Sequence, residues 1–176
     1  MPIKFTDVSP KLDLLPWSSA HETTVVDVSP QAYQQAMAHL KHQSIEQGGL
    51  LIGRAWANPL PSKDTQVARV EILEAIASLN SDATEYSLKM SADVWDAANR
   101  RIAELAEPHL RIVGWFHSHP NLGAFFSATD KATQAAFFNQ PYSVGWVIDP
   151  FTRDRKRHQA FFIGSESEFV EIGTSK

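Results

Sequence analysis

The sequence predicts an α+β domain in which three helices flank a mixed, largely antiparallel sheet, in α/β/α-like layers. Short β-rich apolar runs recur along the chain, and three segments between them have helical periodicity. Several predicted strands follow one another with no helix in between, which favours antiparallel pairing. The length of 176 residues suits one domain, and the content of 43% hydrophobic and 20% charged residues excludes a disordered chain.

The first half of the chain begins with a proline-punctuated segment, residues 1–20, which we expect to form an arm on a domain over 21–176. Ser29 followed by Pro30 predicts a helix start, because serine caps helix N-termini and proline fits the first helical position. Two adjacent glycines, Gly48-Gly49, predict a close approach of backbone or ligand. Strands are predicted over residues 21–27, 45–56, 66–78 and 86–90.

The second half begins with a predicted helix over residues 91–107, which has an apolar stripe at helical spacing and is stopped by Pro108. A second helix is predicted over 127–138, opened by Ser127. Strands are predicted over residues 110–116, 143–148, 159–163 and 168–172.

Composition excludes several classes of function. The chain has no cysteine, so disulfides, a thiol nucleophile, iron–sulfur clusters and cysteine-ligated zinc are excluded. The net charge of −4 and the pI near 5.9 argue against nucleic acid or an anionic membrane as a partner. The sequence has no apolar run of membrane-helix length and no visible signal peptide, so a cytoplasmic location is expected.

The most informative segment carries His117, His119, Ser127 and Asp130. Residues two apart in a strand share a face, so the two imidazoles can converge on one ion. Asp130, in the first turn of the next helix, can supply a carboxylate, and water can complete an open zinc site. Two other interpretations remain: the histidines are unrelated polar residues, or Ser127 and Asp130 only cap a helix.

The sequence His117-Ser-His-Pro, with Ser127 and Asp130 at these spacings, resembles the signature of the JAMM (MPN+) metallopeptidases. Upstream, Glu46 precedes a Gly-Leu-Leu-Ile-Gly run at the position of that family's conserved glutamate. The resemblance covers residues 21–165 and implies an MPN/cytidine-deaminase-like fold. It also implies that the metal is Zn²⁺.

The resemblance implies a role for each residue. His117, His119 and Asp130 would be the zinc ligands. Glu46 would be the general base that takes a proton from the attacking water and returns it to the leaving amine. Ser127 would donate a hydrogen bond to the oxyanion. Ser118 is expected to be structural, because strand alternation points it to the opposite face.

The implied activity is that of a zinc-dependent isopeptidase or peptidase that cleaves after the C-terminal glycine of ubiquitin or a ubiquitin-like protein. The resemblance further suggests a bacterial ubiquitin-like conjugation pathway, with E1-like and E2-like enzymes as partners and a role in antiviral defence. One alternative is a peptidase that processes sulfur-carrier proteins in sulfur or cysteine metabolism. Another is a non-catalytic MPN scaffold.

Two further segments allow a structural and a functional interpretation. Residues 153–158 hold four basic side chains, which predict a solvated hairpin loop or, alternatively, a patch for an acidic partner. Phe125 and Phe126 are expected to pack in the core or to line a substrate channel beside the metal.

Overall fold

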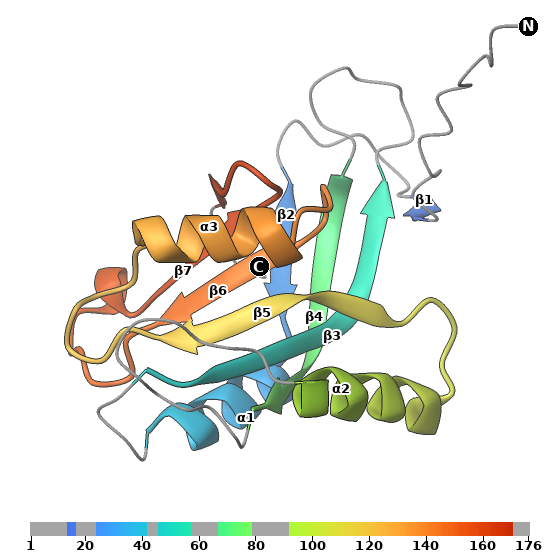
Figure 1. Ribbon diagram of the computed structural model, residues 1–176, viewed down its shortest axis with the longest axis horizontal. Helices are drawn as coiled ribbons and strands as arrows, with labels where there is room; N and C mark the ends of the chain where they lie inside the picture. Colours follow the sequence, from blue (N-terminus) through green and yellow to red (C-terminus); the bar gives the residue numbers. More distant parts are fainter. Residues whose placement is uncertain (1–13, 17–23, 42–45, 58–66, 79–91, 171–176) are drawn as a thin grey trace, which may run out of the picture.

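The computed structural model describes residues 14–16, 24–41, 46–57, 67–78 and 92–170. Within these residues, eight strands form one sheet at the centre of the protein (Figure 1). The strands are β1 (Leu15–Pro16), β2 (Val25–Val28), β3 (Gly48–Ala57), β4 (Val67–Ala77), β5 (Arg111–Ser118), β6 (Val144–Ile148), β7 (Gln159–Ile163) and β8 (Glu168–Val170).

The sheet is mixed and mostly antiparallel, as predicted. Its order is β2-β4-β3-β5-β6-β7-β8, and β1 pairs with the far end of β3. The pairs β3–β4, β3–β5, β6–β7 and β7–β8 are antiparallel. The pairs β1–β3, β2–β4 and β5–β6 are parallel. Parallel neighbours need a crossover connection, and a helix supplies it between β5 and β6.

Three helices cover the two faces of the sheet (Figure 1): α1 (Pro30–Leu40), α2 (Ala92–Leu105) and α3 (Ala128–Phe137). The buried side of α1 packs against one face, where Phe116 and Trp146 lie in the same apolar cluster. On the other face, α2 packs on a second cluster that includes Leu50 and Trp115. α3 lies over this second face, since Gln134 of α3 accepts a hydrogen bond from the Trp115 indole. The α/β/α layering is therefore confirmed.

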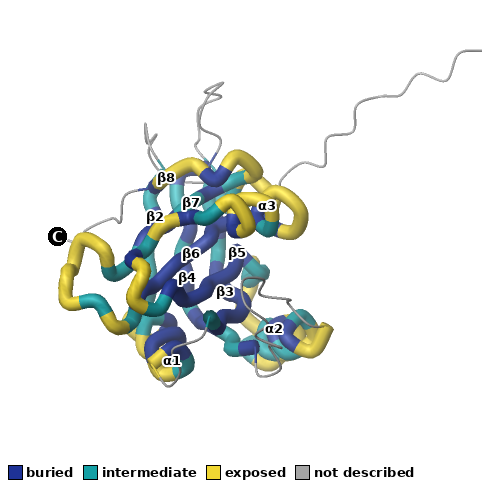
Figure 2. Tube along the Cα trace, turned by 60° about the vertical axis from the view of Figure 1, so that its left-hand side comes forward, coloured by how far each residue is buried: buried dark blue, intermediate teal, exposed yellow. Residues whose placement is uncertain are grey.

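Burial is greatest in the middle strands of the sheet (Figure 2). Every residue of β6 is buried, as are the last six of β5. The predicted close approach at Gly49 is confirmed, because a Cβ atom there would lie 1.9 Å from the carbonyl oxygen of Ile76. β3 and β4 can therefore pair at this point only with a glycine.

The predicted element boundaries hold with local differences. Ser29 caps α1 by accepting a hydrogen bond from the Ala32 amide. α2 ends two residues earlier than predicted, because Ala106 adopts a φ of 50° before Pro108 is reached. The predicted strand over 86–90 lies outside the described residues, and of the arm over 1–20 only residues 14–16 are described. The division into an arm and a catalytic domain stays a prediction.

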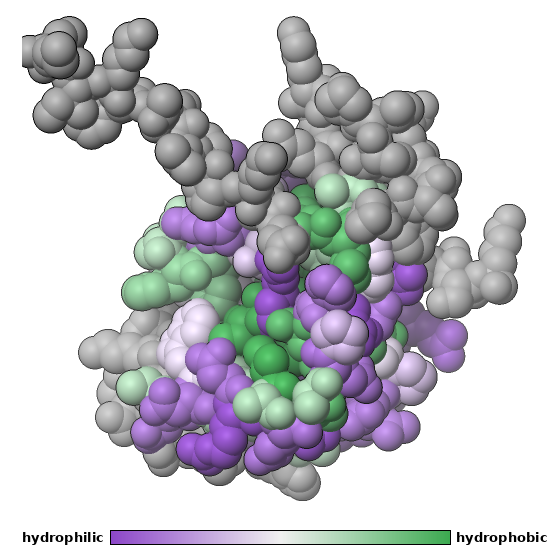
Figure 3. Space-filling model, turned by 90° about the vertical axis from the view of Figure 1, so that its right-hand side faces the viewer, coloured by the Kyte–Doolittle hydropathy of each residue, from purple (hydrophilic) through white to green (hydrophobic). Residues whose placement is uncertain are grey.

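The surface shown in Figure 3 has an apolar area in the middle with polar residues around it, so this face is mixed in character. None of the helices in the described part of the chain is both long and apolar enough to cross a membrane.

Candidate metal centre

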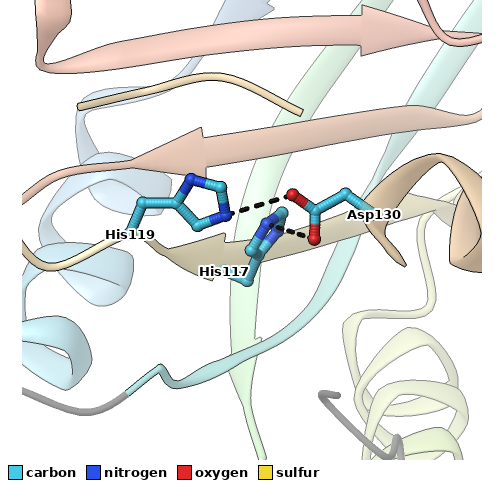
Figure 4. Close-up of side chains that lie close together, drawn as sticks. All are labelled: His117, His119 and Asp130. Carbon is cyan, nitrogen blue, oxygen red and sulfur yellow. Dashed lines mark ion pairs between the residues drawn. The ribbon is translucent and has the colours of Figure 1, made fainter. Parts of the chain in front are cut away.

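Three side chains converge on one point on the α3 side of the sheet (Figure 4). His117 belongs to β5, His119 directly follows that strand, and Asp130 lies in the first turn of α3. The Nε2 atoms of His117 and His119 each lie 3.1 Å from a different oxygen of the Asp130 carboxylate. One potential ligand atom of each residue lies within 4.8 Å of the other two, and all three residues are buried.

The crossover between β5 and β6 explains why these residues meet. The two strands are parallel neighbours, so the chain must return from the end of β5 to the start of β6. A loop over 119–127 and then α3 make this return, which places the N-terminus of α3 beside the carboxyl end of β5. Ligand sites form at the carboxyl ends of strands in sheets connected in this way.

The end of β5 differs slightly from the prediction. The strand continues to Ser118, because Ser118 pairs with Ile148 of β6 and its amide donates to the Gln47 carbonyl. The Ser118 hydroxyl accepts a hydrogen bond from the Gln47 amide, which agrees with the structural role expected for it. The His119 amide still donates to the Ile148 carbonyl, so the two imidazole rings stay close, with centroids 4.9 Å apart.

Asp130 is held by the cap of its own helix. The Ser127 hydroxyl accepts a hydrogen bond from the Asp130 amide at 3.1 Å, and the Ser127 amide donates to Asp130 Oδ2 at 2.9 Å. Burial by itself would raise the pKa of Asp130, but His117, His119 and the Ser127 N–H favour the charged form and hold the pKa well below its usual range. Ser127 and Asp130 therefore do form a helix cap, and this cap places the carboxylate against both imidazoles rather than excluding a role as a ligand.

Glu46 lies beside the three-residue group. It is two residues before β3, and the antiparallel pairing of Gly48 with His117 brings it next to the end of β5. Its Oε1 atom is 3.6 Å from His119 Nε2, and its side chain is 24% exposed. Burial raises the pKa of Glu46; the two histidines lower it, and Asp130 raises it further. The result is a partly accessible carboxyl group with a raised pKa.

The donor set fits a zinc ion. Zinc with ligand bonds of about 2.0–2.1 Å and tetrahedral angles separates its ligand atoms by about 3.3 Å. Each imidazole nitrogen lies 3.1 Å from its own nearest Asp130 oxygen, and one ligand atom of each residue lies within 4.8 Å of the other two, so small side-chain shifts would bring one oxygen and both nitrogens to that spacing. Within the described part of the chain, both nitrogens of His117 and the Nδ1 atom of His119 are buried without a hydrogen-bond partner. Buried polar atoms without a partner in the protein are typical of sites that bind an ion. Three protein ligands also leave a fourth position open.

Sequence reasoning missed the part played by Asp149, which organises the loop after His119. Its buried carboxylate accepts hydrogen bonds from the backbone amides of Asn121 at 3.1 Å, Gly123 at 2.9 Å and Phe151 at 3.0 Å. Burial raises the pKa of Asp149, but these amides more than offset that effect and lower it. The available signal was an aspartate directly after a buried strand, a position from which carboxylates often bind loop amides.

The basic segment is the exposed connection of the β6–β7 hairpin, as predicted, and hydrogen bonds also join it to neighbouring elements. It contains a short 3₁₀ turn, Arg155–Arg157, and the Arg157 guanidinium donates to the Leu122 carbonyl of the loop after His119. His158 Nε2 lies 2.9 Å from the Tyr33 hydroxyl of α1, and His158 Nδ1 lies 2.9 Å from the backbone carbonyl oxygen of Asp149. The segment therefore supports the loop beside the metal centre.

Phe125 and Phe126, for which core packing and a position beside the metal were both open, lie in different environments. Phe126 is buried beside His117, whereas Phe125 is 46% exposed and its ring contacts His119 edge-on at 4.7 Å. Phe126 is thus core, and Phe125 forms part of the rim of the centre.

Comparisons with known proteins agree with this architecture. Residues 29–159 match the family described as prokaryotic homologs of the JAB domain. The chain is 31% identical over 140 residues to COP9 signalosome complex subunit 5 of Caenorhabditis elegans, which covers 77% of this chain and 35% of that protein. It is 29% identical over 154 residues to the Lys-63-specific deubiquitinase BRCC36 of Camponotus floridanus, with coverages of 84% and 58%.

The chain spans about a third to three fifths of the length of these curated relatives. A solved structure, that of protein DSY2949 from Desulfitobacterium hafniense, has a TM-score of 0.57 and 22% identity, covers 86% of this chain and 94% of its own, and supports the fold. The family match extends over about three quarters of the sequence. The chain therefore belongs to the JAB domain family, also called the JAMM or MPN+ family, among its prokaryotic homologs.

Proposed function

We propose that this protein is a zinc-dependent isopeptidase or peptidase that cleaves after the C-terminal glycine of ubiquitin or a ubiquitin-like protein. The observation that carries the proposal is the buried group of His117, His119 and Asp130, with the Glu46 carboxylate 3.6 Å from His119. The substrate class is supported by similarity to a relative named as a Lys-63-specific deubiquitinase. The bond cleaved would be an isopeptide bond to lysine or the peptide bond of a C-terminal extension.

Each residue has a role that its position allows. Zinc held by the two imidazoles and the carboxylate would supply Lewis acidity, which activates water near pH 7 and polarises a carbonyl group. Glu46 would take a proton from the attacking water and pass it to the leaving amine, since its carboxylate faces the centre and remains partly accessible. The Ser127 hydroxyl would donate a hydrogen bond to the carbonyl oxygen as negative charge develops there.

The capping arrangement is compatible with this use of Ser127. Its oxygen accepts a hydrogen bond from the Asp130 amide, and its O–H group can still donate a hydrogen bond to another acceptor. Its backbone amide holds Asp130 Oδ2, so one residue would orient a ligand and stabilise the reacting group. The absence of cysteine from the sequence agrees with hydrolysis by activated water, because no thiol nucleophile is available.

The biological setting is proposed from the family resemblance and not from the geometry of the site. We infer a pathway of ubiquitin-like conjugation in a bacterium, with E1-like and E2-like enzymes as partners and a role in antiviral defence. A cytoplasmic location also stays a prediction. These inferences come from the family resemblance.

The proposal is tested by incubating the protein with a panel of ubiquitin-like proteins fused to a C-terminal extension, with and without a zinc chelator. We expect cleavage after the terminal glycine that the chelator abolishes. Glu46→Gln should retain zinc and fold but lose about 10²–10⁴-fold in kcat, the usual contribution of a general base. Glu168→Gln is the matched control, because Glu168 is exposed on β8.

Three outcomes would contradict parts of the proposal. Equal cleavage with and without the chelator would exclude the zinc mechanism. Wild-type turnover by Glu46→Gln would exclude this residue as the base. A zinc-loaded protein that binds ubiquitin-like proteins but cleaves none of the fusions would favour the scaffold alternative.

A further inference from the structure

Four aromatic rings stack in a column that ends at the metal centre. The rings of Trp95 on α2 and Phe138 are 5.6 Å apart with planes 15° apart, and those of Phe138 and Trp115 are 5.5 Å and 11° apart. The last pair is the tightest: the Trp115 indole and the His117 imidazole have centroids 4.4 Å apart and planes only 7° apart. Trp115 and His117 share a face of β5, so alternation along the strand places one ring over the other.

A buried hydrogen-bond network holds the indole in place. The Trp115 Nε1–H donates to Gln134 Oε1 at 2.6 Å, and Gln134 Nε2 donates to the carbonyl oxygens of Ser143 at 2.9 Å and Gly164 at 3.3 Å. Gln134 is fully buried. Gly145 packs directly against this amide group, since a Cβ atom at Gly145 would lie 2.9 Å from Gln134 Oε1. The amide group of Gln134 is therefore fixed, and it fixes the plane of the indole.

Among the residues that the structure describes, no side chain or backbone group makes the contact to the His117 imidazole that usually orients a metal-binding histidine. Such a histidine normally donates its second ring N–H to a carboxylate, a carbonyl group or water. Nε2 of His117 faces Asp130, which leaves Nδ1 for this contact, yet Nδ1 is buried without a partner among the residues that the structure describes. The flat contact with Trp115 is the closest ring contact that His117 makes there.

We propose that Trp115, locked by Gln134, is a positioning residue that sets the ring plane of His117 for metal binding by stacking. The inference rests on the proposed metal site. Stacking can orient the imidazole because the flat contact restricts rotation of the ring about the Cα–Cβ and Cβ–Cγ bonds of His117. The electron-rich indole face also attracts an imidazole that becomes more positive when it donates electrons to a cation. Trp115 thereby favours the metal-bound form of His117.

The test measures binding of Co²⁺ alone to metal-free protein, by its visible absorption spectrum and apparent dissociation constant. Trp115→Leu removes the stacking ring, and we expect affinity to fall about tenfold or more, with an altered spectrum. Trp115→Phe keeps a ring, and we expect affinity within about threefold of the wild type. Trp146→Leu is the matched control: Trp146 is equally buried and donates to a glutamine, Gln159, but packs on the α1 side of the sheet.

The outcomes separate this inference from the proposed function. If the wild type does not bind Co²⁺, the metal site itself is refuted. If the wild type binds and Trp115→Leu matches Trp146→Leu in affinity and spectrum, only the positioning role is refuted. Equal losses in Trp115→Phe and Trp115→Leu would also overturn it, because the phenyl ring still stacks. If Trp115→Leu does not fold, Trp115→Met takes its place with the same expected loss, since methionine fills irregular apolar space.

Discussion

Replacing Asp149 with asparagine tests how far the loop beside the metal centre depends on one buried carboxylate. Asparagine has nearly the same shape but no charge and only one acceptor oxygen. In the wild type, Oδ1 accepts from the amides of Asn121 and Phe151, and Oδ2 accepts from the Gly123 amide. The best placement of the new side chain keeps the two bonds to Oδ1 and turns an NH₂ group toward the Gly123 N–H.

The magnitude follows from these contacts. A hydrogen bond to a charged group contributes about 1.5–3 kcal/mol, and the substitution loses one such bond and weakens two. We therefore expect Asp149→Asn to lower the free energy of unfolding by about 2–4 kcal/mol. For a chain of 176 residues this corresponds to a Tm lower by about 5–15 °C.

The effect should depend on pH with a definite sign. The backbone amides lower the pKa of Asp149 in the folded protein, so the carboxylate binds protons more weakly than in the unfolded chain. Its contribution to stability is therefore fully present above the unfolded pKa of about 3.9 and is lost as the pH falls through the folded pKa. The difference in stability between the wild type and Asp149→Asn should shrink from pH 7 to pH values below about 4.

Urea and thermal unfolding at several pH values provide the measurement. Asp154→Asn is a suitable control, because Asp154 is exposed, caps the short turn by accepting from the Lys156 amide, and asparagine caps about as well. An Asp149→Asn protein whose Tm stays within about 2 °C of the wild type would refute the reasoning. A large stability difference that is constant from pH 7 to pH 3 would refute its electrostatic part.

Two further predictions concern the centre itself. Ser127→Ala should cost about 1 kcal/mol of stability through the lost cap and should lower kcat by about 10²–10³-fold. Ser127→Thr keeps a hydroxyl and should therefore keep most of the stability and most of kcat. An unchanged kcat with a raised KM would contradict the role of Ser127 in stabilising the oxyanion. Zinc at about a hundred times its Kd should stabilise metal-free protein by about 2.7 kcal/mol and raise Tm by about 5–10 °C, measured by calorimetry. Asp130→Asn should remove most of this rise in Tm. A wild-type Tm that zinc leaves unchanged would exclude the site.

Much of the fold could be predicted because its signals are local. Serine before Pro30 opens α1, the apolar run over 45–56 covers all of β3 except its last residue, and the run over 66–78 contains β4. The sequence predicts the end of β5 two residues early, because the pairing of Ser118 with β6 and its hydrogen bond to Gln47 are not visible in the local sequence. Boundaries of this kind depend on partners elsewhere in the chain.

The candidate site was predictable to the extent that its residues are close in sequence. His117 and His119 are two apart in an extended segment, and Asp130 begins the next helix, so their spacing and chemistry already indicate a metal site. Glu46 was found through the family resemblance. It comes from a segment about seventy residues away, and its place beside His119 depends on the register of β3 against β5.

Without cysteine, and with two histidines and an aspartate at these spacings, the sequence alone points to a metal held by imidazole and carboxylate. What surrounds that group becomes visible only in the folded protein. The indole of Trp115 in β5 stacks on His117, the amide of Gln134 in α3 holds that indole, and the carboxylate of Asp149 after β6 holds the loop after His119. The physical reason is that spacing along one segment fixes which side chains share a face, whereas contacts between segments depend on strand order, register and packing.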